Sequence, residues 1–489
     1  MTGSAILHVT SLLGGGVDRH VRDLARGIDR EHLVWHAGDG VDVIEDARAK
    51  RYFPLAEGAV GDELAGWLRG RRVGLVHLHQ LTRAPRERAE WACRALGVPR
   101  IATLHDILFL RPDAFAARDP LEPDGAWLAG TSRVLAGSAA VLAPSRWLAD
   151  LAAARVPGLR VDVVPNGSAV SDTVSDTAGV REEFARTRPA RVVALLGAIG
   201  PHKGGDLLEE VARRLEGSDI ALVVIGYLEN RFHAGWHIPG RLFVHGAYAD
   251  ADAGALLRAY GASLVLMPSR APESFSYALS DAWAAGVPVL AAPNGALAER
   301  IGAHGGGWLL PEGFDAAAVA REVRALAGGG RENDRARVQS QLARRDPARI
   351  PTLDAMTRTL DAFYARFGID PAEPAGADEA AVQALLATNL DGALFRPELV
   401  RLADELAQTL AALEAERTRS RDFEAEARGW IAKLEADVRA VQEELRQSAQ
   451  ARDALAREAD LLRLNKEALD RLPSPARRLL LKLAFDARR

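Results

Sequence analysis

The sequence predicts an α/β protein with two doubly wound halves and a long helical segment behind them. Two series of short apolar runs alternate with amphipathic helical patterns, which is typical of βαβ units and parallel sheets. A small, polar, glycine-ended stretch separates the two series. The segment 398–468 lacks proline and repeats apolar residues at coiled-coil spacing. At ~150 residues per domain, a chain of 489 residues is too long for one ordinary domain.

Composition excludes several classes of protein. The chain carries 62 Lys and Arg against 66 Asp and Glu, and a nucleic-acid-binding protein would have a strongly basic domain. A single cysteine, Cys93, excludes an internal disulfide and any metal site that needs more than one thiolate. No apolar run approaches the ~18 residues that span a bilayer. The first residues are typical of a strand and not of a signal peptide, so we expect a cytoplasmic protein.

Residues 1–167 are expected to form the first doubly wound domain. Its first strand is followed by three glycines and a helix with Val17, Val21 and Leu24 on one face. The predicted strands are the short apolar runs 5–10, 74–81, 99–106, 139–145 and 161–167.

Residues 168–350 are expected to form the second domain, which begins with the polar linker 168–179. Its predicted strands are 192–200, 221–227, 242–248, 262–269 and 287–293. Such folds bind ligands at the carboxyl ends of their strands, so we expect a site in the cleft between the halves. A closing helix is predicted at 351–368.

The C-terminal part begins with a linker at 369–397, rich in Pro, Ala and Gly. We interpret 398–468 as a coiled coil that forms a homo-oligomer or binds a partner helix; the alternative is a long helix packed on its own globular part. Within 469–489, the basic amphipathic stretch 473–489 suits an anionic membrane surface or a docking partner. Apolar residues recur at steps of three and four at Ile431, Leu434, Val438, Val441 and Leu445.

One lysine stands out as a candidate ligand for phosphate. The chain has five lysines and 57 arginines, and Lys203 is the only lysine between Lys50 and Lys433. It lies in the glycine-flanked loop LGAIGPHKGG before a predicted helix, where a compact ammonium and a helix N-terminus suit a diphosphate. Gly15 and Gly16, between the first strand and its helix, would let the backbone approach a ligand. The alternatives are a surface lysine and a tight turn.

The stretch PESFSYALSDAWAAGVPVLA, residues 272–291, is the most informative. Glu273 and Asp281 are eight residues apart, which is ~12 Å along a helix and matches the reach from the sugar to the ribose of a nucleotide sugar. The helix N-terminus between the two acids would face the diphosphate. The alternative is a pair of solvated carboxylates.

Histidines follow two of the predicted strands. His105 and Asp106 come at the end of an apolar strand and would face the cleft, although a histidine there is often a satisfied core residue. His77 and His79 share one strand face, as a pair of metal ligands would. No third ligand joins them at a recognisable spacing, so no metal site is predicted.

Together these stretches resemble the retaining GT-B glycosyltransferases of the large group 1, or family-four, type. The resemblance covers roughly residues 5–367, and its most specific element is 272–291, which is similar to the family's E-x7-E motif. The other carriers are LHVTSLLGGGVDRHV, VHLHQ, ATLHD, LAPSRWLAD, VVPNG and LGAIGPHKG.

The resemblance implies a GT-B fold, in which two Rossmann-like domains face a cleft. The second domain would bind a nucleotide-sugar donor and the first a glycan or lipid-linked acceptor. The sugar would be transferred with retention and without a metal or other cofactor. The sequence of the second half is most similar to enzymes of bacterial surface polysaccharide synthesis. Such an enzyme would be cytoplasmic, or peripheral on the inner face of the plasma membrane through its basic tail.

The resemblance also assigns roles by position. Lys203 would neutralise the diphosphate, Glu273 would hold sugar hydroxyls and Asp281 would bind the ribose. The remaining assigned residues would approach the phosphates or contact the sugar: Gly15, Gly16, His105, Phe275 and Ser276.

Two positions depart from the family pattern. Asp281 replaces the usual Glu, and Ala198 replaces an Arg that often precedes the lysine. Arg270, in the adjacent loop, is a candidate for the missing cation. Two alternatives follow: a non-catalytic coiled-coil scaffold with a degenerate GT-B module, and a GT-B sugar-nucleotide epimerase, for which no additional acid/base groups are evident.

Overall fold

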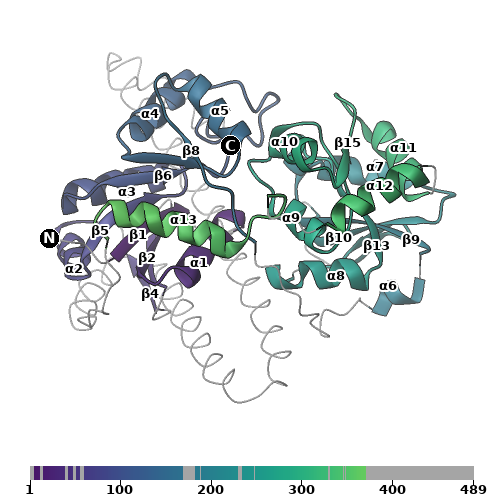
Figure 1. The fold of residues 1–489 in the computed structure, drawn as a ribbon, viewed down its shortest axis with the longest axis horizontal. Coiled ribbons are helices and arrows are strands. Elements are labelled where there is room, and N and C mark those ends of the chain that lie inside the picture. The colour runs from purple at the N-terminus through teal and green to yellow at the C-terminus, as the bar shows by residue number, and fades with distance from the viewer. Residues whose placement is uncertain are drawn as a thin grey trace, which may run out of the picture. The chain divides into compact units, whose positions relative to one another are not determined.

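The protein is described by a computed structural model covering residues 5–369. Short gaps fall at 12–14, 39–41, 48–50, 56–59, 169–181, 188, 229–233, 247, 329–330, 345 and 347. Two sheets organise the described chain, and we call them, with their helices, the first and second lobes (Figure 1). The predicted coiled coil at 398–468 and the basic tail at 473–489 lie outside the described residues.

The first lobe contains an eight-stranded sheet of order β4-β3-β2-β1-β5-β6-β7-β8. Its strands are β1 (Ala5–Ser11), β2 (Glu31–Ala37), β3 (Asp42–Asp46), β4 (Arg51–Leu55), β5 (Val73–Leu78), β6 (Arg100–Thr103), β7 (Ala140–Ala143) and β8 (Asp162–Val163). Its helices are α1 (Gly16–Gly27), α2 (Asp62–Gly70), α3 (Arg83–Leu96), α4 (Gly125–Ala136) and α5 (Arg146–Arg155).

The second lobe contains a seven-stranded sheet of order β11-β12-β10-β9-β13-β14-β15. Its strands are β9 (Arg191–Ile199), β10 (Ile220–Leu228), β11 (Gly235–Ile238), β12 (Leu242–Val244), β13 (Ala262–Met267), β14 (Val289–Ala291) and β15 (Gly307–Leu309). Its helices are α6 (Glu182–Thr187), α7 (Gly205–Arg214), α8 (Ala253–Ala259), α9 (Tyr277–Ala284), α10 (Gly295–His304), α11 (Ala316–Ala327) and α12 (Glu332–Leu342), with 3-10 turns η1 (Pro201–Lys203) and η2 (Asp250–Asp252).

Every predicted strand overlaps an observed strand, but the two sheets, predicted as parallel, are mixed. β3 and β4 extend the first sheet in antiparallel pairings, and β11 pairs antiparallel with β12 at the edge of the second. These strands, and also β2 and β15, were not predicted from the sequence. β2, EHLVWHA, carries a glutamate and two histidines, and β3, DVIED, has only two apolar residues, so neither stands out as an apolar run.

Alternate residues of the central strands pack into cores on opposite faces of each sheet. In β1, Leu7 joins the core beneath α2 and α3, whereas Ile6 joins a core formed with α1 and the last described helix, α13 (Leu353–Arg366). Figure 1 shows α13 in green across the strands of the first lobe, although it follows the second lobe in sequence. This helix falls within the predicted closing helix and buries Met356, Leu360 and Tyr364.

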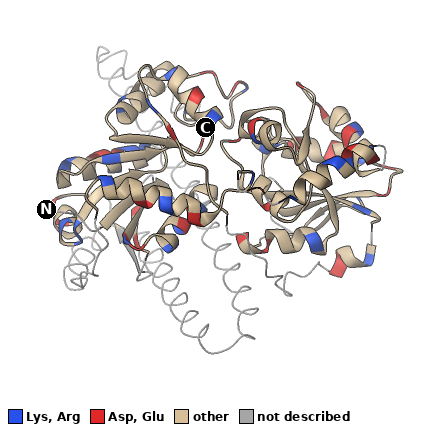
Figure 2. Cartoon of the chain, in the orientation of Figure 1, with Lys and Arg blue, Asp and Glu red and all other residues tan. Residues whose placement is uncertain are grey.

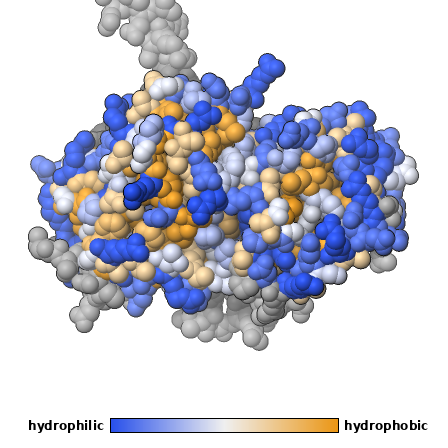
Figure 3. Space-filling view, turned by 45° about the horizontal axis from the view of Figure 1, so that its top comes forward, coloured by the Kyte–Doolittle hydropathy of each residue, from blue (hydrophilic) through white to orange (hydrophobic). Residues whose placement is uncertain are grey.

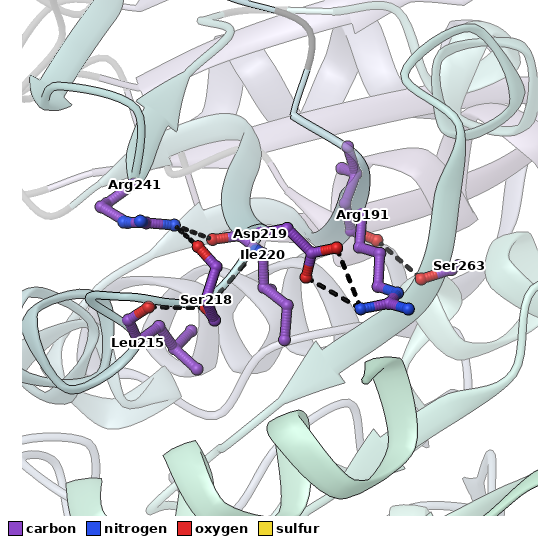
Figure 4. Close-up of polar contacts among 8 residues, drawn as sticks. Arg191, Leu215, Ser218, Asp219, Ile220, Arg241 and Ser263 are labelled. Carbon is purple, nitrogen blue, oxygen red and sulfur yellow. Dashed lines mark hydrogen bonds and ion pairs between the residues drawn. The ribbon is translucent and has the colours of Figure 1, made fainter. Parts of the chain in front are cut away.

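Charged residues lie mainly on the helices and loops, while the central strands are largely apolar (Figure 2). The amino-terminal ends of β9 and β10 are held by polar contacts (Figure 4). The guanidinium of Arg191 donates to both carboxylate oxygens of Asp219 at 2.8 and 3.0 Å, and Arg241 donates to the carbonyls of Ser218 and Ile220. This end of the second sheet is fixed by side chains, and at the opposite end β9 is followed by the glycine-flanked turn η1.

The packing of α13 on the first lobe predicts the effect of two substitutions in one helix. Leu360→Ala should lower the free energy of unfolding by ~2–5 kcal/mol, because the buried leucine leaves a cavity in the core shared with Ile6 and Leu24. Arg358→Ala, which removes an exposed ion pair with Asp354, should change it by less than ~0.5 kcal/mol. Urea denaturation measures both values. Equal effects would contradict the packing of α13 described above.

Candidate active site

Lys203 and Glu273, both predicted to bind the donor, lie together at the carboxyl ends of neighbouring strands. Lys203 ends the turn η1 after β9, and Glu273 lies in the loop after β13. The Lys203 Nζ atom is 3.5 Å from Oε1 of Glu273, and both side chains are partly exposed, at 32% and 21%. Ser269, which is buried, donates from its hydroxyl to the same carboxylate oxygen at 3.3 Å. An ammonium and a carboxylate are thus available to one ligand.

Two glycines let the neighbouring loops approach this pair. At Gly204, φ is +79°, and a Cβ would lie 2.3 Å from the carbonyl oxygen of Pro268. At Gly295, the first residue of α10, φ is +57°, and a Cβ would lie 2.6 Å from the carbonyl oxygen of Glu273. Neither position accommodates a side chain without moving backbone, which explains the glycine before α7 and the glycine that begins α10.

The acidic stretch does not form the single helix that its spacing suggested. The helix α9 begins only at Tyr277, so Glu273 precedes it and the eight-residue separation from Asp281 is not a helical rise. Ser276, the residue before α9, has φ +68°, a value that is uncommon outside glycine. No sequence signal indicated this conformation. The loop therefore turns sharply between the acid and the helix.

Arg300 on α10 holds this turn through hydrogen bonds to its carbonyls. Its guanidinium donates to the carbonyls of Phe275 and Ser276 at 2.9 and 3.1 Å, and to the Ser280 hydroxyl at 2.8 Å. It also donates to the carbonyl of Arg349 at 3.0 Å and lies 4.0 Å from the centre of the Phe275 ring. Burial lowers the pKa of Arg300 to about 9, and the group stays charged at neutral pH. Sequence reasoning missed this residue, since nothing in its local pattern marks it.

The backbone N–H groups of Phe275 and Ser276, unlike their carbonyls, are not engaged by Arg300. Their carbonyls face Arg300, and among the described residues their N–H groups donate to no acceptor. They immediately precede the first turn of α9, whose N–H groups have no intrahelical acceptor. A turn of this kind at a helix N-terminus favours an anion such as a phosphate.

Asp281 is paired with a residue of the first lobe. Arg19 on α1 donates to its two carboxylate oxygens at 3.0 and 3.2 Å, and the guanidinium lies 4.3 Å from the centre of the Tyr277 ring. Burial raises the pKa of the Asp281 carboxyl, and the Arg19 charge opposes that rise. The residue predicted to bind a ribose is therefore held by an arginine that the sequence analysis did not single out.

The glycine turn before α1 in the first lobe lies near the start of α9. Gly15 has φ +79° and precedes α1, and a Cβ on Gly16 would lie 3.5 Å from the ring of Tyr277. The first lobe thus approaches the start of α9 through backbone with no side chain between them.

Two further contacts join the lobes. The Ser274 hydroxyl donates to the backbone carbonyl of His105, so the loop with Glu273 touches the end of β6. The Glu299 carboxylate accepts from the backbone N–H groups of Arg146 and Trp147 at 3.1 and 2.5 Å, at the start of α5. A cavity of about 470 Å³ lies beside this contact, lined by residues of both lobes that include Trp147, Asn294 and Glu299.

Arg270, the proposed substitute cation, is exposed and engaged. Its Nε and Nη2 atoms donate to the two carboxylate oxygens of Asp206 at 3.1 and 2.6 Å. Both side chains are about half exposed. Its charge is therefore partly neutralised on the rim of the loop.

Histidines gather at the carboxyl end of the first sheet. His105 does not stand alone: its Nε2 lies 3.1 Å from Nδ1 of His79, and the ring of His20 packs edge-on against it at 4.7 Å. The potential ligand atoms of His8, His77 and His79, and of His20, His79 and His105, lie within 4.8 Å of one another. The third histidine that the sequence did not provide at a recognisable spacing thus comes from other strands and from α1.

These two groups differ in how far their nitrogens are already used. His8, His77 and His79 each make two hydrogen bonds through their ring nitrogens. Neither ring nitrogen of the buried His20 has a hydrogen-bond partner of normal geometry among the described residues. A metal at the first group would replace existing hydrogen bonds, and at the second it would also break the bond between His79 and His105.

Two family models match the chain. The model described as "Glycosyltransferase Family 4" matches residues 14–171, and the one described as "Glycosyl transferases group 1" matches residues 180–342. The chain therefore contains one domain of each kind, and its two lobes are the two Rossmann-like domains of a GT-B fold. Among the described helices, none is long and apolar enough to cross a bilayer.

Curated relatives match part of the chain. It is 30% identical over 253 residues to a D-inositol 3-phosphate glycosyltransferase of Nocardia farcinica, which covers 47% of this chain and 54% of the relative. It is 27% identical over 216 residues to a lipopolysaccharide 1,2-N-acetylglucosaminetransferase of Salmonella typhimurium, with 39% and 53% covered. The chain spans about half the length of the curated relatives it matches.

Solved structures match the fold over most of the described residues. HepE of Anabaena in complex with UDP-glucose has a TM-score of 0.54 at 17% identity, with 74% of this chain and 99% of that chain covered. Sucrose-phosphate synthase from Thermosynechococcus elongatus has a TM-score of 0.52 at 15% identity, with 74% and 98% covered. At these identities, the likeness establishes the fold.

The histidines predict a loss of stability in acid. Burial lowers the pKa of His20 and of His32 to about 4, and lowers the pKa values of His8, His77, His79 and His105 well below 6.5. Between pH 6.5 and 4 the unfolded chain therefore binds more protons, and each histidine costs up to ~1.4 kcal/mol per pH unit as pH falls. Burial raises the pKa of Asp106 to about 6, so the folded protein gains stability from this carboxyl as pH falls below 6. This gain offsets the destabilisation from about one histidine.

We therefore expect the protein to unfold cooperatively between pH 6 and 4. Circular dichroism at constant ionic strength measures this transition. A His32→Gln variant, with one titrating group fewer, should have a shallower dependence of its unfolding free energy on pH. A stability that is constant from pH 6.5 to 4.5 would show that these histidines are not buried as neutral groups.

The contact between Gly295 and the Glu273 backbone predicts a position-specific cost of adding a methyl group. Gly295→Ala should lower the free energy of unfolding by ~1–3 kcal/mol, because the positive φ and the close carbonyl both resist a Cβ. Gly302→Ala in the same helix meets no atom within 4 Å and should raise stability by ~0.5–1 kcal/mol. Thermal and urea denaturation compare the two. A neutral Gly295→Ala would mean that the loop is not held against α10.

Proposed function

We propose that this protein is a glycosyltransferase that moves a sugar from a nucleotide-sugar donor to a glycan or lipid-linked acceptor, with retention and without a metal ion. The observation that carries the proposal is the convergence of Lys203, Glu273 and the unpaired N–H groups before α9 at one edge of the second sheet. The two family matches and the UDP-glucose bound to HepE, a protein of the same fold, support a nucleotide-sugar donor.

The donor would lie with its diphosphate between the Lys203 ammonium and the start of α9. The N–H groups of Phe275 and Ser276 would donate to sugar or phosphate oxygens, with Gly15 and Gly16 approaching from the first lobe. Glu273, whose carboxylate already accepts from Ser269, would accept from hydroxyls of the donor sugar. His105, tied through its carbonyl to Ser274, would lie against the sugar.

The ribose would be bound by Asp281. In the structure this carboxylate is paired with Arg19, so the ribose hydroxyls would either share the carboxylate with the guanidinium or displace it. Because Arg19 belongs to the first lobe, this pair would couple donor binding to the arrangement of the lobes. Arg270 would be a weaker contributor of positive charge, since Asp206 already pairs with it.

Catalysis would be mainly electrostatic. As the bond to the donor sugar breaks, negative charge grows on the diphosphate and positive charge grows on the sugar ring. Lys203 and the N–H groups before α9 would lie where the negative charge develops, so they would stabilise the transition state without reorganising. The acceptor would attack on the side from which the diphosphate departs. Contact between the lobes would exclude the water that hydrolyses the donor.

The acceptor would be a precursor of a bacterial surface polysaccharide. A relative that is named a lipopolysaccharide 1,2-N-acetylglucosaminetransferase supports this class of acceptor. The sequence of the second half, which resembles such enzymes, supports it as well. The segments 398–468 and 473–489 would hold the enzyme in an oligomer or on a partner, and near the inner face of the membrane.

A second candidate is a non-catalytic scaffold with a degenerate GT-B module. The pairing of Asp281 with Arg19 favours it, since a side chain already engages the carboxylate that is proposed to bind the ribose, and so does Ala198 in place of an arginine. Donor hydrolysis or transfer by the full chain separates the two candidates.

The enzyme hypothesis predicts a large effect at one lysine. Saturation-transfer NMR with UDP-, GDP- and dTDP-sugars identifies the donor, and its hydrolysis or transfer is then followed as nucleoside diphosphate release. Lys203→Ala should lower turnover by at least ~100-fold, the scale of removing one transition-state donor. Lys203→Arg should restore only part of the activity, since the planar fork does not replace a compact ammonium.

The matched control is Arg213→Ala on α7, which removes an exposed cation of the same lobe that pairs with Glu209. Its turnover should equal that of the unaltered protein. Near-normal turnover of Lys203→Ala beside an unchanged Arg213→Ala would refute the role of Lys203. Failure of every donor to bind would favour the scaffold.

A further inference from the structure

Four histidines form a continuous hydrogen-bonded row across the first sheet. They come from four neighbouring strands or their carboxyl ends: His32 in β2, His8 in β1, His79 after β5 and His105 after β6. The linked nitrogens are 2.8 Å apart between His32 and His8, 2.9 Å between His8 and His79, and 3.1 Å between His79 and His105. His8 and His79 are completely buried, and His105 at the end of the row is partly exposed.

The far end of the row fixes the direction of every hydrogen bond. The Nε2 atom of His32 lies 3.2 Å from the carbonyl oxygen of Ile28, which can only accept, so Nε2 of His32 carries the proton. In a neutral imidazole the other nitrogen is then a bare acceptor. Nδ1 of His32 must therefore accept from Nε2 of His8.

The same step repeats along the row. Nδ1 of His8 accepts from Nε2 of His79, and Nδ1 of His79 accepts from Nε2 of His105. All four rings are then the same tautomer, with the proton on Nε2. The Nδ1 atom of His105 is then left without a proton, and no described residue forms a hydrogen bond with it.

The surroundings keep the row neutral. Burial is the first cause that lowers the pKa of each of the four rings, and neighbouring histidines lower most of them further. Around the row, the packed elements present the neutral rings of His20 from α1 and His77 from β5, and the Tyr364 hydroxyl from α13, which bonds to His77. The charges that act on His32 are those of Arg30 and Asp361, which form an ion pair with each other and shift its pKa in opposite directions. Asp106 is adjacent to His105 in the chain, and burial raises its pKa to about 6.

We propose that His32, His8 and His79 are positioning residues that transmit the polarity of the Ile28 carbonyl to His105, so that its Nδ1 is a fixed hydrogen-bond acceptor for a substrate hydroxyl. The identity of the hydroxyl as one of a sugar rests on the proposed function, whereas the tautomer does not. An acceptor nitrogen receives a hydrogen bond from a hydroxyl and repels a carboxylate or phosphate oxygen. The row therefore makes His105 a specificity device for neutral, hydroxylated ligands.

The test is direct observation of the tautomers in the full chain. Uniform ¹⁵N-histidine labelling and long-range ¹H–¹⁵N correlation spectra at pH 7.5 distinguish a protonated from a bare ring nitrogen, and loss of one signal set in His105→Gln assigns that ring. We expect the unaltered protein to show a bare Nδ1 at His105 and the Nε2–H form in His8, His32 and His79. A protonated Nδ1, or an averaged mixture, at His105 overturns the proposal.

Substitution at the far end tests transmission. His32→Phe removes the anchor three rings away and should convert His105 to a mixture of tautomers, whereas His32→Gln, whose amide both donates and accepts, should restore the single form. His77→Phe is the matched control, since His77 is equally buried but bonds to Thr103 and Tyr364 outside the row. An unchanged His105 in His32→Phe overturns transmission. If His32→Phe does not fold, the spectrum of the unaltered protein still decides the tautomer.

Kinetics then tests the role toward substrate. With a donor that turns over, His32→Phe should lower kcat/KM by ~3–10-fold, the scale of one neutral hydrogen bond, and His32→Gln should recover it. A bare Nδ1 at His105 with no transferase activity would leave the row intact and refute only the proposed function. A full kcat/KM in His32→Phe, with a mixed tautomer, would overturn the role of Nδ1 in binding.

Discussion

The buried guanidinium of Arg300 is the interaction on which the geometry of the candidate site depends. It holds two consecutive carbonyls, those of Phe275 and Ser276, and so fixes the turn between Glu273 and α9. Each carbonyl is engaged by Arg300, and the N–H groups of the same two residues have no acceptor among the described residues. A charge without a bonded carboxylate is costly to bury, and here neutral acceptors and the faces of Phe275 and Trp283 surround it. The hydrogen bonds to the carbonyls of Phe275, Ser276 and Arg349 and to the Ser280 hydroxyl offset part of that cost.

Contacts between the lobes converge on the same region. Arg19 reaches Asp281, Ser274 reaches the carbonyl of His105, and Glu299 caps the start of α5. Each contact joins a residue next to the acidic turn to an element of the first lobe. The apolar surface in Figure 3 is interrupted by hydrophilic residues, which agrees with an exterior on which only Phe115 and Leu309 are large, exposed apolar side chains among the described residues. Polar contacts at the carboxyl ends of the strands are therefore a main link between the lobes.

The sequence predicted what depends on local pattern. Apolar runs located the central strands, and the scarcity of lysine drew attention to Lys203, which the structure brings to Glu273. It did not predict the turn at Ser276, because a positive φ in a serine has no compositional signal. Arg19 and Arg300 were missed because their roles arise from partners distant in sequence, one of them 262 residues away. The histidine row was missed for the same reason: its members come from four neighbouring strands or their carboxyl ends and share no sequence spacing.

The most direct test of the central claim is a crystal structure of the full chain with the nucleoside diphosphate of its preferred donor. We predict phosphate oxygens within about 3 Å of Lys203 Nζ and of the N–H groups of Phe275 and Ser276. The Arg300 contacts to the two carbonyls should be unchanged. A nucleotide bound away from the start of α9, or a diphosphate that does not contact Lys203, would contradict the account.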